Sequence, residues 1–154
     1  MKKIFLMAIL SIVLVSCNND DNGEQSFTPQ TITPVLIAQS DLLGVAIFSI
    51  PDEDQYNNYF NNENDWENFL NNNSALSFYP EIGNIDFNYD TILVCVDYTK
   101  PTFGYSIGFN SIIEYENEVV VSIKYAGNDG GATMPSRPFI IVKIPKTEKP
   151  IVFE

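Results

Sequence analysis

The chain has 154 residues, of which 45% are hydrophobic and 18% are charged, a composition typical of one soluble domain and unlike that of a disordered chain or a protein with several transmembrane spans. It contains no histidine, which excludes a Ser-His-Asp triad, a Cys-His pair and a histidine-ligated zinc. The formal net charge is −12, and the 14 acidic residues between Cys17 and Thr99 are accompanied by no lysine or arginine. Such negative charge repels phosphate backbones, so we expect no nucleic-acid partner.

The amino-terminal segment has the three parts of an export signal. Lys2 and Lys3 precede an apolar run of 12 residues, Ile4 to Val15, and small residues follow. A helix needs about 20 apolar residues to span a bilayer, so this run predicts a removable signal rather than a permanent anchor. Leu14-Val15-Ser16-Cys17 resembles the lipobox of bacterial lipoproteins, whose cysteine receives a diacylglycerol. The resemblance implies a signal peptide over residues 1–16 and attachment to a membrane through a lipid on Cys17.

Residues 17–34 are polar, acidic and almost free of apolar side chains. Such a segment buries too little surface to offset the entropy lost on ordering, so we expect a flexible tether up to Pro34. Asn18-Asn19-Asp20-Asp21 partly matches the acidic signal that directs some lipoproteins to the cell surface. The match favours an outer-membrane lipoprotein of the cell envelope and leaves the leaflet open.

Cys95 lies in the apolar run Leu93 to Val96, where burial raises the pKa of a thiol. A lipidated Cys17 leaves Cys95 without a partner for a disulfide within the chain, so we predict an inert, buried thiol. A hydrolase built on a carboxylate pair needs no histidine, but the sequence singles out no pair of acidic residues. We therefore expect no catalytic residue, no metal site and no cofactor.

Asp86, Asn88 and Asp90 have the oxygen spacing that begins a calcium loop. Thr91 stands where such a loop needs glycine, and a continuous apolar stretch follows it. The residues therefore favour an Asx turn that leads into a strand.

Residues 35–154 predict one mainly β domain, an antiparallel sandwich or meander of about six to eight strands with one short helix. Thr91 to Tyr98 is apolar on both faces and should be a central strand covered on both sides. Glu116-Asn117-Glu118 is typical of a tight turn, and Pro150 predicts that the last strand lies at a sheet edge. The expected strands are Val35–Ala38, Val45–Ile50, Thr91–Tyr98, Gly104–Phe109, Ser111–Tyr115, Val119–Tyr125, Phe139–Ile144 and Ile151–Phe153.

The helix is expected over about residues 64–71. Asn64 can cap its amino terminus, and Trp66 and Phe69 fall on one face. A lone tryptophan on such a face predicts a core anchor rather than a ligand platform. Asn71-Asn72-Asn73 should end the helix.

Two loops carry residue types that a β fold alone does not demand. Residues 100–105 place a proline, a glycine and two aromatics between two expected strands, and residues 125–138 form a long, glycine-rich stretch with the only arginine. Tyrosine and arginine often carry interface energy, so we expect both loops to bind a protein partner. The alternative, that Phe103 and Tyr105 only cover the end of the core, stays open. The candidate partner-binding residues are Lys100, Pro101, Thr102, Phe103, Gly104, Tyr105, Asn128, Asp129, Gly130, Gly131, Arg137 and Phe139.

A series of short motifs runs from Trp66 to Phe153. They are Trp66-Glu67-Asn68-Phe69-Leu70, Asp86-Phe87, Lys100-Pro101-Thr102-Phe103-Gly104-Tyr105-Ser106-Ile107, Val119-Val120-Val121, Pro138, Val142-Lys143-Ile144-Pro145-Lys146 and Ile151-Val152-Phe153. In this order, over about Tyr56 to Phe153, they resemble the carboxy-terminal domain of the PrcB protease-complex subunits. Members known as PrcB are lipoproteins that accompany a surface protease and are not themselves proteolytic, which is what the resemblance implies here. Phe103 departs from the family, which often has a further glycine at this position.

A looser likeness concerns three loop segments. Pro101 to Tyr105, Gly130-Gly131 and Arg137-Pro138-Phe139 are similar in order to the three inhibitory loops of chagasin-type cysteine-protease inhibitors, although the last gap is shorter. We expect a lipid-anchored, non-catalytic binding protein, an accessory subunit of a secreted protease, with a chagasin-like inhibitor as the alternative. Substitution of Tyr105 or Arg137 should weaken partner capture and leave unfolding nearly unchanged.

Overall fold

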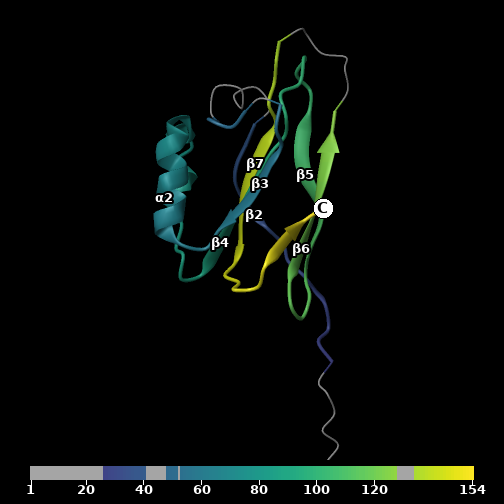
Figure 1. Ribbon diagram of the computed structural model, residues 1–154. Helices are drawn as coiled ribbons and strands as arrows, with labels where there is room; N and C mark the ends of the chain where they lie inside the picture. The colour runs from purple at the N-terminus through teal and green to yellow at the C-terminus, as the bar shows by residue number, and fades with distance from the viewer. Residues whose placement is uncertain (1–25, 41–47, 52, 128–133) are drawn as a thin grey trace, which may run out of the picture.

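The structure is a computed structural model that describes residues 26–40, 48–51, 53–127 and 134–154. These residues form a β sandwich of two four-stranded sheets, with a helical layer against the outer face of one sheet (Figure 1). The fold class predicted from the sequence, a mainly β sandwich with one short helix, is confirmed.

Sheet A has the strand order β1-β5-β6-β8. Its strands are β1 (Gln30–Thr31), β5 (Ser106–Glu114), β6 (Val119–Ala126) and β8 (Ile151–Phe153). The predicted turn joins β5 to β6, and the Tyr115 N–H donates to the Glu118 carbonyl at 2.8 Å. A register shift between Phe109 and Ser111 bulges β5, so the two strands predicted there are one. β8 lies at the sheet edge as predicted, but it pairs with β6 in parallel.

Sheet B has the strand order β2-β7-β4-β3, and all its pairs are antiparallel. Its strands are β2 (Val35–Ser40), β7 (Phe139–Pro145), β4 (Asp90–Val96) and β3 (Tyr56–Phe60). β4 is buried on both faces, as predicted for a central strand. Ile92 and Val94 pack toward the helical layer, whereas Leu93 and Cys95 pack toward sheet A. Because side chains alternate along a strand, a run that is apolar at every position supplies two cores.

The helical layer covers the outer face of sheet B. It consists of α2 (Glu63–Asn72) and two 3₁₀ helices, η1 (Ser74–Phe78) and η2 (Pro80–Gly83). Asn62 rather than Asn64 caps α2, since its Oδ1 accepts a first-turn N–H at 2.9 Å. Trp66 is 3% exposed and stacks on Phe69 with 5.5 Å between ring centroids, so the predicted core anchor is confirmed. Asn73 ends the helix by donating from Nδ2 to the Phe69 carbonyl at 2.7 Å.

The predicted tether is too long at its carboxyl end. Gln30 pairs with Glu114 and Thr31 with Ile113 in β1, although both lie inside the segment predicted to be flexible up to Pro34. Main-chain hydrogen bonds to the edge of β5 hold this part of the chain, and they depend on backbone groups rather than on apolar side chains.

Two further strand predictions differ from the structure. Of the strand expected over Val45–Ile50, residues 45–47 lie outside the described part of the chain, and residues 48–50 are not in a strand. β3 was not expected, because asparagine is uncommon in strands and interrupts the apolar alternation; its pairing with the buried β4 outweighs that preference.

Candidate functional site

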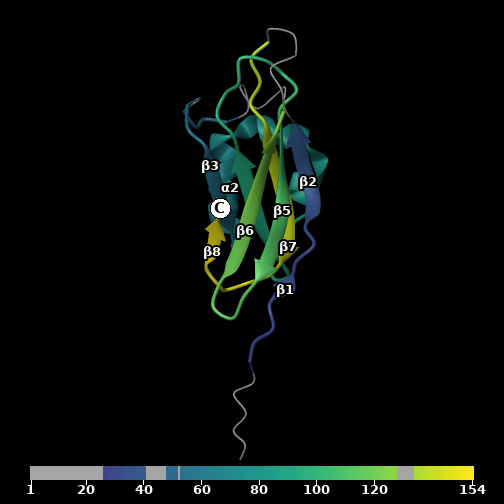
Figure 2. The same ribbon diagram turned by 90° about the vertical axis from the view of Figure 1, so that its right-hand side faces the viewer.

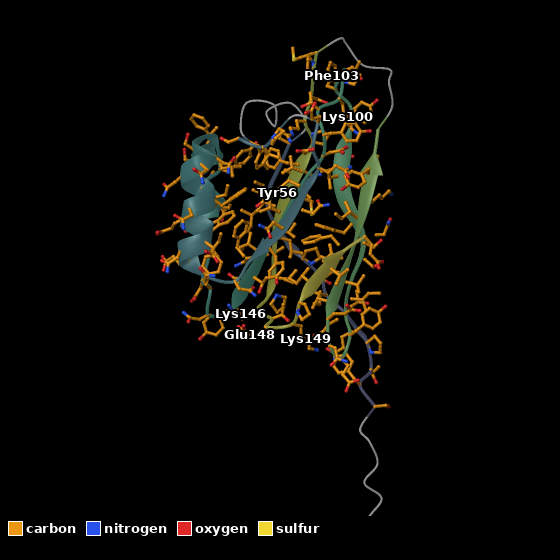
Figure 3. All side chains as sticks on the ribbon, viewed as in Figure 1. Tyr56, Lys100, Phe103, Lys146, Glu148 and Lys149 are labelled. Carbon is orange, nitrogen blue, oxygen red and sulfur yellow. The ribbon has the colours of Figure 1, made fainter. Side chains whose placement is uncertain are left out.

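The two loops predicted to bind a partner meet at one end of the sandwich, which we call the loop end (residues 97–105 and 134–137). The Lys100 N–H donates to the Ser136 carbonyl at 2.7 Å, and the Ser136 N–H donates back to the Lys100 carbonyl at 3.0 Å. The Ser136 hydroxyl also donates to the Thr102 carbonyl at 2.7 Å. The loop end lies at the top of Figure 3, and these bonds fix one segment against the other.

Lys100 is a structural residue of the loop end. Its Nζ lies 2.7 Å from Asp97 Oδ2 and 3.2 Å from the centroid of the Tyr98 ring. Gln55 Nε2 donates to the other Asp97 oxygen at 2.8 Å. Burial by itself lowers the pKa of Lys100, but hydrogen bonds to Asp97 and Tyr98 outweigh it and raise the pKa above its usual value. Lys100 is only 8% exposed, so its cation holds the loop and presents little surface to a partner.

Arg137 is fully buried, and the prediction that it contacts a partner is wrong. Its Nε donates to the Asp97 carbonyl at 3.0 Å. Its Nη1 donates to the Ile50 carbonyl at 2.7 Å, and its Nη2 donates to the carbonyls of Pro51 and Asp54 at 2.7 and 3.0 Å. The guanidinium thus ties the turn before β3 to the end of β4, which satisfies main-chain acceptors that would otherwise lack partners.

Phe139 is the second predicted contact residue that the structure places in the interior. It is fully buried in the core between sheet B and the helical layer. There its ring meets Phe48 edge-on at 5.2 Å and Tyr79 at 5.7 Å between centroids. The alternation of β7 turns this ring toward the helical layer, so its prediction as a contact residue is wrong.

Exposed apolar side chains nevertheless gather at the loop end. Tyr98 is 45% exposed, Phe103 is 36% exposed and Met134 is 56% exposed. Of the remaining predicted residues, Pro101 and Gly104 are exposed, Thr102 and Tyr105 are half-buried, and Asn128, Asp129, Gly130 and Gly131 lie outside the described residues. Tyr98 and Met134 were not among the predicted contact residues; the signal for Tyr98 is its position directly after a buried strand.

Tyr105 packs against the main chain of the neighbouring strand end. Gly127 has a φ of +150°, and a Cβ there would lie 2.5 Å from Tyr105 Cδ1. Only glycine fits this position, because a side chain would meet the ring and the backbone conformation disfavours other residues. The Tyr105 ring therefore covers the end of the sandwich, which favours the structural interpretation for this residue.

Cys95 and the acidic residues before β4 lie as the sequence predicts. Cys95 is fully buried, as predicted, and burial raises the pKa of its thiol to about 12, which keeps the thiol protonated at neutral pH. The Asn88 N–H donates to Asp86 Oδ1 at 2.9 Å in the predicted Asx turn, and Asp90 Oδ2 accepts from Lys143 Nζ at 2.9 Å.

Within the described part of the chain, no group of three or more Cys, Asp or Glu side chains could hold a metal ion. Among the same residues, no helix is long and apolar enough to cross a membrane.

A second concave feature, which we call the side groove, runs between β2 and the free edge of β5. Figure 2 shows these strands side by side above β1. The groove consists of two hollows of about 500 and 360 Å³ that share Gln39. The first is lined by residues 36–40 of β2 together with Tyr79, Tyr105 and Ser106, and the second by residues 31–34, Gln39, residues 107–112 and Ile140.

Comparison of the chain with protein-family models, with curated proteins and with solved structures gave no match.

Proposed function

We propose that the chain is a lipid-anchored, non-catalytic binding protein of the cell envelope that captures a protein partner at its loop end. The observation that carries the proposal is the exposure of Tyr98, Phe103 and Met134 on segments whose main chain is fixed by hydrogen bonds. Aromatic residues and methionine are enriched in protein interfaces. A segment that is fixed before binding loses little conformational entropy on association.

The position of the loop end supports an anchor at the other end of the molecule. The chain enters the sandwich at the end opposite to the loop end (Figure 1). Cys17, the proposed lipid-attachment residue, precedes Ser26 by nine positions, which span at most about 30 Å when extended. A lipid on Cys17 would hold the domain close to an outer-membrane leaflet, with the loop end directed away from it.

A secreted or surface protease is the partner class that we propose. The motifs that resemble the PrcB subunits include residues 100–107 of the loop end, and members of that family accompany a protease without cleaving protein themselves. The inhibitor alternative is weaker, because Arg137 and Phe139 of its third segment are fully buried and reach no protease cleft.

The test removes two exposed side chains of the loop end. The full-length chain carrying Phe103→Ala and Met134→Ala should capture at least about tenfold less partner from native membranes than the unchanged chain, as quantified by mass spectrometry of co-purified proteins. Its free energy of unfolding should change by less than about 1 kcal/mol, since neither side chain is buried.

The matched control removes an exposed ring elsewhere. Tyr89 is 74% exposed, and its carbonyl accepts from the Lys146 N–H at the end of the molecule opposite the loop end (Figure 3). Tyr89→Ala should leave capture unchanged. Equal capture by all three proteins would contradict the proposal, whereas slowing of a papain-like protease at stoichiometric amounts would favour the inhibitor.

A further inference from the structure

Among the described residues, one edge of β5 lacks a strand partner over most of its length. β1 pairs with that edge only at Ile113 and Glu114. Residues 106–109 and Ser111 pair with β6 on one side, and no strand of the described part of the chain pairs with them on the other. A free strand edge presents main-chain donors and acceptors that can pair with another extended segment.

Gln39 identifies which main-chain groups face this edge. Its Nε2 crosses from β2 and donates to the Ile107 carbonyl at 2.9 Å, so that carbonyl points away from β6. An added strand would replace this side-chain donor with a main-chain N–H. Every second residue of a strand directs its main-chain groups to the same side, so Phe109 also faces the free edge. After the bulge the Ile112 carbonyl points the same way, since it accepts the Ile32 N–H at 2.8 Å.

The side groove that follows this edge is uncharged. None of the described residues that line its two hollows is Asp, Glu, Lys or Arg, although 18% of the chain is charged and its net charge is −12. Leu36 is 56% exposed and lines the larger hollow. A charged segment would lose its hydration in this groove without gaining an ion pair, so the lining selects an uncharged occupant.

We propose that the side groove binds an extended, uncharged peptide segment of another protein, which adds to the free edge of β5 as a strand. β1 already pairs antiparallel with the lower end of the same edge, so an added strand would continue its line toward Ser106. In this mode of recognition, main-chain hydrogen bonds supply affinity and pockets for alternate side chains supply specificity. The site is separate from the loop end and does not depend on the function proposed there.

The first experiment selects ligands from a display library of random twelve-residue peptides on the full-length chain. Enriched peptides should be depleted in charged residues relative to the library. A selected peptide should bind the Leu36→Glu variant at least about tenfold more weakly, because the new carboxylate lies in the groove. Leu36→Thr, which keeps a good strand residue, should weaken binding less and guards against a folding defect in the first variant.

Val35→Glu is the matched control. Val35 lies next to Leu36 in β2 and has the same exposed fraction, 56%, but it does not line the groove. This variant should bind the selected peptide as the unchanged chain does. The Phe103→Ala and Met134→Ala variant should also retain binding, which separates this site from the loop end.

The second experiment tests main-chain pairing. Two versions of a selected peptide are made, one methylated at the odd-numbered and one at the even-numbered main-chain nitrogens. One version should lose binding and the other should keep it, because an added strand turns only alternate N–H groups toward β5. Equal binding of both methylated sets would overturn the proposal, as would undiminished binding to Leu36→Glu. Failure to enrich any peptide, or self-association that Leu36→Glu abolishes, would likewise show that the groove takes no such segment from another protein.

Discussion

Arg137 joins parts of the chain that lie far apart in sequence. Its guanidinium reaches the carbonyls of Ile50 and Pro51, 87 and 86 positions earlier, as well as that of Asp97. The residue type favoured a partner contact in the sequence analysis, because arginine is common in interfaces. The acceptors that bury it are main-chain groups, which a sequence pattern does not reveal. The sequence therefore predicts the position of the loop before β7, but it does not predict the structural role of Arg137.

Arg137→Ala is expected to lower the free energy of unfolding by at least about 3 kcal/mol, because it leaves several buried carbonyls without a donor. Arg137→Lys should recover only part of the loss, since one ammonium cannot reproduce the planar fork of the guanidinium. Urea denaturation measures both changes. Lys124→Ala, at an exposed position of β6, is the control and should stay within about 0.5 kcal/mol of the unchanged chain. A loss this small in Arg137→Ala would contradict the structural role.

Cys95 makes stability depend on alkaline pH. Burial raises the pKa of its thiol from 9.0 to about 12, so the unfolded chain releases this proton at lower pH than the folded chain. The contribution of this thiol to the free energy of unfolding is constant below pH 8. It declines as the pH rises through 9, by about 0.8 kcal/mol between pH 8 and 9.5. Urea denaturation across this range measures the decline.

The Cys95→Ala variant should remove that decline while being less stable than the unchanged chain at pH 8, where the thiol is protonated in both states. Burial also raises the pKa of Tyr125, and that of Lys100 is raised as well, but their usual values of 10.0 and 10.5 place most of their effect at higher pH. An unchanged pH dependence in Cys95→Ala would show that another group titrates between pH 8 and 9.5.

At the scale of elements, α2 is held to sheet B chiefly by aromatic side chains. Trp66 packs on Phe69 and meets Phe60 of β3 edge-on with 5.2 Å between centroids. Trp66→Ala should lower the free energy of unfolding by about 3–5 kcal/mol, because it removes buried apolar surface and also leaves a cavity. Trp66→Phe should cost clearly less, since the indole Nε1 is buried without a hydrogen-bond partner among the described residues. Chemical denaturation followed by circular dichroism measures both; equal losses would contradict this packing.

The elements found from the sequence are those whose pattern reflects local burial. β4 was recognised because it is apolar at every position from Ile92 to Val96, and the β5–β6 hairpin because a turn separates two alternating runs. β3 and β1 were missed because strand pairing, rather than their own side chains, stabilises them. The parallel pairing of β8 was missed for a related reason: an alternating pattern is the same for a parallel and an antiparallel neighbour.

At the scale of the whole molecule, the proposed lipid determines where the protein resides. Cys17→Ser removes the sulfur that would carry the diacylglycerol. On detergent phase separation, the unchanged chain should therefore enter the detergent-rich phase and the variant the aqueous phase. Mass spectrometry of the unchanged chain should find Cys17 as a lipid-modified amino terminus. An unmodified Cys17, or equal membrane retention of the variant, would contradict the anchor.

Because sheet B is packed on both faces, the helical layer is also a cover. If α2 and the 3₁₀ helices detached, Ile92, Val94 and Ile141 would form part of a flat apolar surface on a sheet that stays intact beneath them. Surfaces of this kind promote aggregation of otherwise native chains. The solubility of concentrated protein would then depend on whether the ten-residue helix α2 stays packed on sheet B, and not on unfolding of the sandwich.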